Sequence, residues 1–343
     1  MKVLGINGWS ERGHDGGASL IVDGKLLFSV EEEKLICKRH AYDTLPLESI
    51  KTCLNYGNIT MDDIDRVVIG WDYEKLYEML VNSFSKKGIN LEIKRANEIS
   101  LKVNEAMVDL PSFVLFYDKD IYLSLRLEAI GCKVFNNSRA ILLCDNKILM
   151  YQELFKNNIR IPKTYIAPKT FENINYCNLD FLNTIEKELG YPMVFKEAYG
   201  SFGEQVYLVN NHNEAISLIK KIGYKDFLIQ EYIKTSKGKD IRINVVNHKP
   251  VCSILRYNDF DFRSNISNGG KATNYKPNKE FLDLAIKASK ALNLDFGTVD
   301  MLVDEYNHPI VCELNSNPQF KSTFDVTNVD LSDYIRDYII SKL

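Results

Sequence analysis

The sequence of 343 residues lacks long apolar runs, paired-cysteine motifs and an excess of charge of one sign. No apolar stretch approaches the roughly 18 residues that a membrane-spanning helix needs, and the N-terminus lacks the apolar core of a signal peptide. The 43 basic and 46 acidic side chains leave a formal charge of -3, which gives no reason to expect binding to nucleic acid or to a membrane. We therefore expect a cytoplasmic globular protein whose partners are small or locally recognised.

Cysteine is present, but not in the pairs that indicate a disulfide framework or a zinc site. The seven cysteines are scattered from Cys37 to Cys312 without a C-x-x-C motif, which favours reduced thiols. The phosphate-binding motif G-x-x-x-x-G-K-[ST] is also absent, as are repeats of fixed period. With 45% hydrophobic residues the chain can bury a large core, and its length allows two or three domains.

The order of strand-like and helix-like segments predicts three parts. Residues 1–72 read as three strands, a helix and a strand, and residues 73–144 alternate helices and strands as in a small α/β layer. From residue 145 onward, helices and strands form an α+β body with lobes at 145–233 and 234–343. The fold class we expect is therefore mixed α/β and α+β.

Three local features follow from the same patterns. Asp23-Gly24 separates two strand-like runs and is a strong signal for a hairpin turn. The alternating segment LEIKRA (91–96) predicts a strand, and the apolar segment FVLFY (113–117) predicts another.

Two strands near the C-terminus, FGTVDMLV and IVCELN, are joined by a connection of six residues and predict an antiparallel hairpin. Pairing that is symmetric about the turn places Val303 opposite Ile310. Counting outward along the same register places Asp300 opposite Glu313. The period of two then puts Asn315 on the face of the sheet that carries Glu313.

Two carboxylates in directly opposite positions would have Cβ atoms about 5 Å apart, and like charges there are destabilising. We therefore expect a positive group between Asp300 and Glu313. Oxygen donors without histidine or cysteine are typical of a hard cation such as Mg²⁺. The alternative is a solvated sheet face on which both carboxylates pair with lysines, and this motif alone does not decide between the two.

The segment YPMVFKEAYGSFG places Lys196 at the end of a strand, just before a turn that contains Gly200 and Gly203. Glycines allow backbone N–H groups to close around a phosphate. The alternative is an ordinary hairpin with a surface lysine.

Two further segments combine charged residues with strand ends or turns. An apolar strand ends at residues 230–233 (QEYI), and Asp240 and Arg242 alternate on the next strand. Arg263 and Asn265 precede a glycine pair, and an arginine near metal and phosphate stabilises the charge that develops in phosphoryl transfer. Taken alone, each segment is also explained by salt bridges or turn formation.

In this order, the segments QEYI, KGKDIR, DFRSN, NGGKA, GTVD and CELNSNP resemble the motifs of RimK-type ATP-grasp ligases. The resemblance covers about residues 113–343. It implies an ATP-grasp fold, in which two α+β lobes (145–343) hold ATP between their sheets behind a small pre-grasp domain (73–144).

The resemblance also implies the residues that bind ATP. Lys147 and Lys196 would contact the phosphates, Glu231 with Tyr232 the adenine, and Asp240 the ribose region. The full set implied for nucleotide binding is Lys147, Lys196, Gly200, Ser201, Gly203, Gln230, Glu231, Tyr232, Ile233, Asp240, Arg263, Ser264 and Asn265.

Catalytic and metal-binding residues are implied in the same way. The implied catalytic residues are Arg242, which would meet the substrate carboxylate, Arg263 and Asn265. The implied ligands of Mg²⁺, or of Mn²⁺ in its place, are Asp300, Glu313 and Asn315.

The chemistry implied by the resemblance is ligation of a carboxylate to an amine through an acyl phosphate, with release of ADP and phosphate. The product would be an amide, such as glutamate or another amino acid added to a protein, a peptide or a small amine. Self-association into a homo-oligomer is also expected. The alternatives are a non-catalytic nucleotide-binding scaffold, or an accessory protein of a carbamoyl-transfer or secondary-metabolite pathway.

Residues 1–72 resemble the start of NodU/TobZ-type carbamoyltransferases, in LGINGWSERGHDGGASLIVDGKLLFSVEEEK and in KRH ending at His40. This resemblance implies an actin-like (ASKHA) β-sheet fragment. The next histidine is His212, so the downstream metal ligands of that family have no counterpart. In one interpretation the segment is a structural appendage in which His14 and His40 are ordinary polar residues, and in the other it binds a small acyl donor or a partner enzyme.

Overall fold

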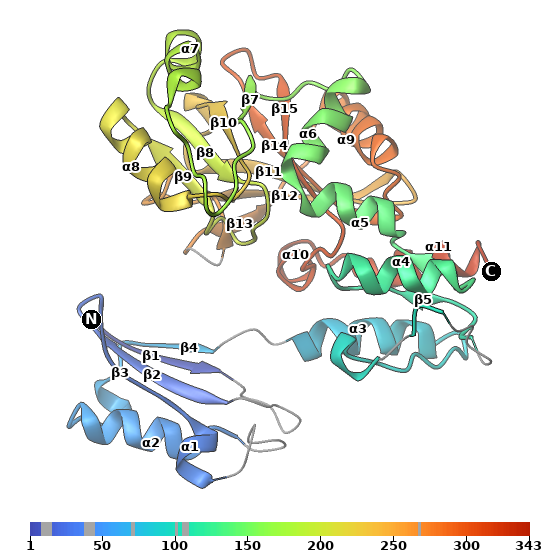
Figure 1. The fold of residues 1–343 in the computed structure, drawn as a ribbon. Coiled ribbons are helices and arrows are strands. Elements are labelled where there is room, and N and C mark those ends of the chain that lie inside the picture. The colour runs from blue at the N-terminus through green and yellow to red at the C-terminus, as the bar shows by residue number, and fades with distance from the viewer. Residues whose placement is uncertain (8–15, 38–44, 70–72, 100–101, 105–109, 267–268) are drawn as a thin grey trace. The chain divides into compact units, whose positions relative to one another are not determined.

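The structure is a computed structural model that describes all residues except 8–15, 38–44, 70–72, 100–101, 105–109 and 267–268 (Figure 1). His14 and His40 therefore lie outside the described residues. The chain divides into two compact units, Met1–Glu78 and Met79–Leu343. In the described part of the chain, no helix combines the length and the apolar character needed to span a bilayer.

The N-terminal unit contains a four-stranded sheet with the order β3-β2-β1-β4, in which β1 and β4 are parallel. Leu4 and Leu20 are fully buried and pack with Cys53 of α2. The predicted turn at Asp23-Gly24 is confirmed, since both residues have positive φ between β2 and β3. The elements of this unit are β1 (Lys2–Asn7), β2 (Gly17–Val22), β3 (Lys25–Glu31), α1 (Glu32–Ile36), α2 (Leu47–Tyr56), η2 (Met61–Asp63) and β4 (Arg66–Ile69).

The larger unit opens with a small α/β layer in which β5 and β6 are parallel. Phe116, Leu127 and Ile141 share its core. The strand expected at 91–96 is wrong: these residues join no sheet, and Ile93 is exposed, so the alternating pattern finds no partner strand. Helix α3 (Tyr73–Ser85) spans the boundary between the two units. The elements that follow it are η3 (Ala96–Glu98), β5 (Val114–Leu115), α4 (Ile121–Ala129), β6 (Val134–Phe135), α5 (Ser138–Asp145) and α6 (Lys147–Lys156).

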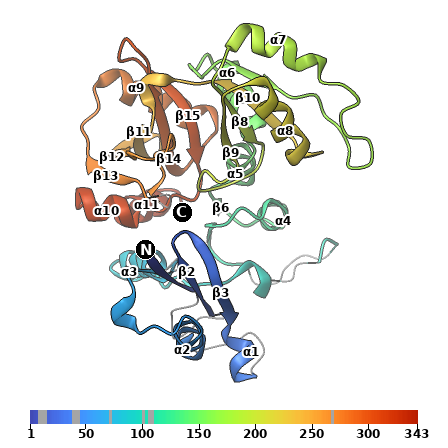
Figure 2. The ribbon, with the colours of Figure 1, turned by 90° about the vertical axis from the view of Figure 1, so that its left-hand side faces the viewer.

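A four-stranded antiparallel sheet with the order β7-β10-β8-β9 forms the first lobe, and α7 and α8 pack against it (Figure 2). Its core includes Phe195 and Phe227, whose rings stack at a centroid distance of 5.9 Å. The elements are β7 (Thr164–Ile166), α7 (Asp180–Leu189), β8 (Met193–Glu197), β9 (Val206–Val209), α8 (His212–Ile222) and β10 (Phe227–Glu231).

A five-stranded antiparallel sheet with the order β13-β12-β11-β14-β15 forms the second lobe. Helices α6 and α9 pack on this sheet, and Leu228 of the first lobe joins the same core. The elements are η4 (Lys234–Ser236), β11 (Lys239–Val246), β12 (Lys249–Tyr257), β13 (Lys271–Asn274), α9 (Lys279–Ala291), β14 (Phe296–Val303), β15 (Pro309–Asn315), α10 (Lys321–Thr327) and α11 (Leu331–Ile340).

The register of the β14–β15 hairpin is confirmed at one place and wrong at another. Val303 pairs with Pro309, not with Ile310, whereas Asp300 does pair with Glu313. A β-bulge between these pairs adds one residue to β15 and restores the predicted pairing.

Candidate active site

A cavity of about 120 Å³ lies where the two lobes meet, and it gathers most of the predicted site residues. This volume is smaller than the roughly 300–1,000 Å³ that is typical of ligand pockets. The predicted residues that line the cavity are Lys147, Lys196, Gly200, Ser201, Gly203, Gln230, Glu231, Tyr232, Ile233, Asp240, Arg263, Ser264, Asn265, Asp300 and Glu313. Arg242 and Asn315 do not line it.

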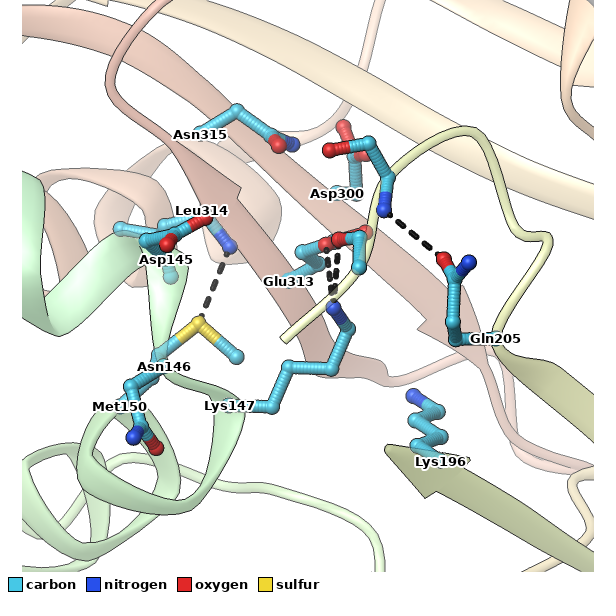
Figure 3. Close-up of polar contacts among 12 residues, drawn as sticks. Asp145, Asn146, Lys147, Met150, Lys196, Gln205, Asp300, Glu313, Leu314 and Asn315 are labelled. Atoms are coloured by element: carbon cyan, nitrogen blue, oxygen red, sulfur yellow. Dashed lines mark hydrogen bonds and ion pairs between the residues drawn. The ribbon is translucent and has the colours of Figure 1, made fainter. Parts of the chain in front are cut away.

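Lys147 and Lys196 bring two buried ammonium groups to the cavity, with only 5% and 7% of each residue exposed. The Asn146 side chain accepts hydrogen bonds from the N–H groups of Ile148 and Leu149, so α6 begins at Lys147. Lys147 Nζ donates to the Gly200 carbonyl at 2.9 Å and lies 3.7 Å from Glu313 Oε1 (Figure 3).

The pKa of Lys147 is lowered, first by burial, which the Glu313 carboxylate partly offsets. The neighbouring Lys196 and Lys119 ammonium groups lower the pKa of Lys147 further. This crowding of positive charge is complementary to an anionic ligand such as a triphosphate.

Lys196 ends β8, where its Nζ donates to the Tyr151 hydroxyl at 3.1 Å and contacts Cys312 Sγ at 3.6 Å. Tyr151 in turn donates to the Cys312 carbonyl. Burial raises the pKa of Tyr151 to about 12, so the hydroxyl remains protonated at neutral pH. Neither Tyr151 nor Cys312 was predicted from the sequence, because only the fold brings them to Lys196.

Two glycines of the turn between β8 and β9 have positive φ. Gly200 and Gly203 have φ of 153° and 74°, and a Cβ atom at Gly200 would lie 2.4 Å from Gln205 Oε1. That oxygen accepts a hydrogen bond from the Ser201 N–H at 3.2 Å (Figure 3). Arg263 donates to the Gly203 carbonyl and so closes the turn against the second lobe.

The end of β10 carries the residues expected at the adenine. The Glu231 carboxylate accepts a hydrogen bond from the Lys163 N–H at 2.8 Å, and Gln230 donates to Thr164 Oγ1 at 2.8 Å. The Tyr232 hydroxyl is buried and has no hydrogen-bond partner among the described residues. The side chains of Gln230 and Glu231 therefore stabilise the end of β10 through these hydrogen bonds.

Asp300 is 2% exposed and lies between two arginines. Arg242 binds it through two hydrogen bonds of 2.8 and 2.7 Å, and Arg256 adds a third at 2.9 Å. Burial would raise the pKa of Asp300, but the two guanidinium groups outweigh burial and hold it below its ordinary value. The solvated, lysine-paired alternative for Asp300 is therefore wrong, while Glu313 does lie near a lysine.

Arg256 also binds both oxygens of Asp240, which it faces across β11 and β12. Sequence reasoning missed Arg256, and the cross-strand register to Asp240 is the signal that could have found it. Arg242, expected at the substrate carboxylate, instead binds Asp300 in this structure.

The donor set at the hairpin fits a hard cation. Asp300, Glu313 and Asn315 offer carboxylate and amide oxygens from paired strands, and Asn315 Nδ2 lies 3.5 Å from Thr298 Oγ1. In the described residues no group of three or more His, Cys, Asp and Glu side chains is placed to hold a metal. The three predicted ligands carry the oxygen donors that Mg²⁺ prefers, and both oxygens of Asp300 are bound by arginines in this structure.

The chain is similar to known proteins over the residues that form this site. A family model described as a RimK-like ATP-grasp domain matches residues 144–339, which is more than half of the chain. The chain belongs to the RimK-like ATP-grasp family. Membership of this family implies the use of ATP with Mg²⁺. A second family model, described as the carbamoyltransferase N-terminus, matches residues 2–135.

Three relatives of this RimK-like chain illustrate the range of the family. Uncharacterized protein MG012 of Mycoplasma genitalium is 31% identical over 264 residues, which cover 75% of this chain and 92% of that protein. N-acetylaspartylglutamate synthase A of Homo sapiens is 32% identical over 69% of this chain and 60% of its own length. Alpha-aminoadipate–LysW ligase LysX of Saccharolobus solfataricus is 31% identical over 64% and 78%. The chain is an ATP-grasp enzyme of the carbon–nitrogen ligase class.

Solved structures confirm the ATP-grasp fold. A RimK domain protein from Sphaerobacter thermophilus has a TM-score of 0.61 at 17% identity, covering 76% of this chain and 94% of that one. D-alanine–D-alanine ligase from Bacillus anthracis, solved with ATP, has a TM-score of 0.53 at 19% identity, covering 83% and 88%. The actin-like character of residues 1–72 and the domain boundary near residue 72 stay predictions.

Proposed function

We propose that this RimK-like enzyme joins a carboxylic acid to an amine in an amide bond, through an acyl phosphate. The observation that carries the proposal is the meeting of Lys147 and Lys196 with Asp300 and Glu313 around one cavity. A phosphate-binding turn and a metal-binding hairpin in contact are what phosphoryl transfer from ATP requires.

The reaction proceeds in two steps. A carboxylate oxygen of the acid attacks the γ-phosphorus of ATP, the bond from that phosphorus to the β-phosphate oxygen breaks, and ADP leaves. The amine nitrogen then attacks the carbonyl carbon, the carbon–oxygen bond to phosphate breaks, and the nitrogen releases a proton. No protein nucleophile takes part.

The side chains offset the repulsion between two anionic reactants. Lys147 and Lys196 bind the phosphates, and the backbone of Gly200, Ser201 and Gly203 encloses them. Asp300, Glu313 and Asn315 would hold Mg²⁺, which when bound neutralises charge on the β- and γ-phosphates.

The remaining predicted residues have distinct roles in this proposal. Arg263 and Asn265, with Ser264 beside them, contact the transferred phosphoryl group, and Arg242, which binds Asp300 in this structure, is the residue proposed to meet the carboxylate of the acid. The residues from Gln230 to Ile233 hold the adenine, and Asp240 lies toward the ribose. Mn²⁺ could replace Mg²⁺, because both prefer oxygen ligands.

The amine that we propose is an amino acid such as glutamate, free or within a peptide. The names of two relatives, N-acetylaspartylglutamate synthase A and beta-citrylglutamate synthase B, support this choice because both contain glutamate. The two names differ in the part that is joined to glutamate, so the test below uses a panel of acids.

The test measures ADP release with ATP and Mg²⁺ across a panel of acids, with hydroxylamine in place of the amine. We expect one class of acid to give both ADP and a hydroxamate, which reports the acyl phosphate. Lys196→Met should abolish both signals, whereas Lys187→Met, on the exposed surface of α7, should leave both unchanged. Nucleotide binding without ADP or hydroxamate for any acid would instead identify a non-catalytic scaffold.

A further inference from the structure

Cationic side chains from three separate segments contact the turn between β8 and β9. Lys147, at the start of α6, and Arg263, in the second lobe, each donate to a carbonyl oxygen of the turn. The third is Lys119, whose Nζ donates to Ser201 Oγ at 3.0 Å. Lys119 lies between β5 and α4, ahead of the residues 144–339 that match the RimK-like family model.

A carboxylate fixes the position of the Lys119 ammonium group. Asp145, the last residue of α5, accepts a hydrogen bond from Lys119 Nζ at 2.7 Å, and the Lys119 side chain is 32% exposed. Asp145 stands two residues before Lys147, so the same helix junction positions both lysines. Lys119 is thus held at the turn by two hydrogen bonds, and its side chain is partly exposed.

We propose that Lys119 is a further phosphate-binding residue, which contacts the γ-phosphate of ATP and the phosphate of the acyl phosphate. The inference rests on the proposed function. Lys147 and Arg263 contact the turn as Lys119 does, and both belong to the set proposed to bind ATP. Because a phosphate oxygen is a stronger acceptor for an ammonium group than a serine hydroxyl, Lys119 exchanges Ser201 for phosphate when ATP is present.

The γ-phosphate is the part of ATP that Lys119 reaches. Lys119 shares the helix junction with Lys147, whose Nζ lies 3.7 Å from Glu313. Metal ligands in phosphoryl-transfer sites lie beside the β- and γ-phosphates. Lys119 does not itself line the cavity, but Ser201, to which it donates, does. We therefore place Lys119 at the γ-phosphate, where the segment before residue 144 would supply one side chain to the chemistry.

The experiment compares the affinity of the full chain for two nucleotides by calorimetry in the presence of Mg²⁺. Lys119→Met should weaken binding of AMPPNP, which has a γ-phosphate, by roughly tenfold or more, since one charged hydrogen bond is lost. Binding of ADP should be unchanged. Lys119→Arg should retain most of the AMPPNP affinity, and the matched control Lys133→Met, at an exposed lysine before β6, should change neither value.

The ADP measurement also reports whether the Lys119→Met variant is folded. Equal loss of AMPPNP and ADP binding would overturn the proposal, because Lys119 would then only shape the turn. No loss of either would overturn it as well. If the unaltered chain binds neither nucleotide, the proposed function itself fails, and this proposal fails with it.

Discussion

Asp300 and Glu313 pair across one hairpin, yet their surroundings differ. Asp300 is 2% exposed and binds Arg242 and Arg256, whereas the Glu313 side chain is 30% exposed and lies 3.7 Å from Lys147. Breaking a buried ion pair leaves an uncompensated charge, and the cost is smaller where one of the two partners is partly exposed to water. Two residues with the same proposed role should therefore respond differently to loss of charge.

We expect Asp300→Asn to lower the free energy of unfolding by about 3 kcal/mol, because Arg242 loses its buried anion. Glu313→Gln should lower it by less, because the Glu313 side chain is 30% exposed and Lys147 keeps its hydrogen bond to the Gly200 carbonyl. Both variants should lose ADP release, since each removes a proposed metal ligand. Urea denaturation measures the free energy of unfolding. Equal destabilisation of the two variants would contradict the expectation that the more buried carboxylate contributes more to stability.

Deprotonation of Lys147 should limit the activity with ATP at alkaline pH. Its pKa is lowered, so its proton dissociates at a pH below that of an ordinary lysine, and the loss of positive charge weakens phosphate binding as the pH rises. We expect kcat/KM for ATP to fall on the alkaline side, and Lys147→Arg to shift that fall to higher pH because guanidinium stays charged. An unchanged profile in the arginine variant would assign the limit to another group.

Individual site residues were predictable from the sequence where a motif fixes them. Lys196 and its glycines stand within a few residues of each other, and the hairpin count places Asp300 opposite Glu313. Arg256 is missed for a different reason, because its partner Asp240 is found only when the register of the β11–β12 hairpin is counted. Tyr151 was not predictable in this way, since its partners Lys196 and Cys312 are distant in sequence.

At the scale of elements, symmetric pairing about the turn predicts the Asp300–Glu313 pair of the β14–β15 hairpin correctly, although it does not account for the β-bulge. Symmetric pairing fails at Val303, which faces Pro309, and holds at Asp300 only because of the bulge. The same difficulty applies to LEIKRA, where alternation is present without a neighbouring strand. Local pattern predicts an element, but pairing depends on what the rest of the chain places beside it.

Tyr151 joins three elements, since its hydroxyl on α6 contacts the Cys312 carbonyl of β15 and Lys196 of β8. We expect Tyr151→Phe to lower the free energy of unfolding by about 1–3 kcal/mol, because buried polar groups lose their partner. Tyr122→Phe is the matched control, since Tyr122 is 83% exposed. Equal urea midpoints for the two variants would show that the junction does not stabilise the fold.

At the scale of the whole molecule, the described residues that line the cavity come from the unit Met79–Leu343. The described lining residues begin at Lys147, so none of them falls in residues 2–135, which match the carbamoyltransferase N-terminus, although Lys119 of that segment contacts the lining residue Ser201. A histidine pair without further ligands is too small a set for a metal site.

We expect the double variant His14→Ala/His40→Ala to retain ADP release within error, because the proposed ligase chemistry uses residues of the larger unit. The measurement is the same coupled assay, with wild-type protein alongside. A selective loss of turnover with intact nucleotide binding would instead favour the interpretation in which this segment binds an acyl donor or a partner enzyme.

The contacts of Tyr151 and Arg263 differ in their access to solvent. The Tyr151 hydroxyl is buried and fastens β8 to β15, whereas the Arg263 side chain, which donates to the Gly203 carbonyl, is 25% exposed. A phosphate that arrives from solvent can therefore compete for Arg263, while the contacts of the Tyr151 hydroxyl are shielded from such competition.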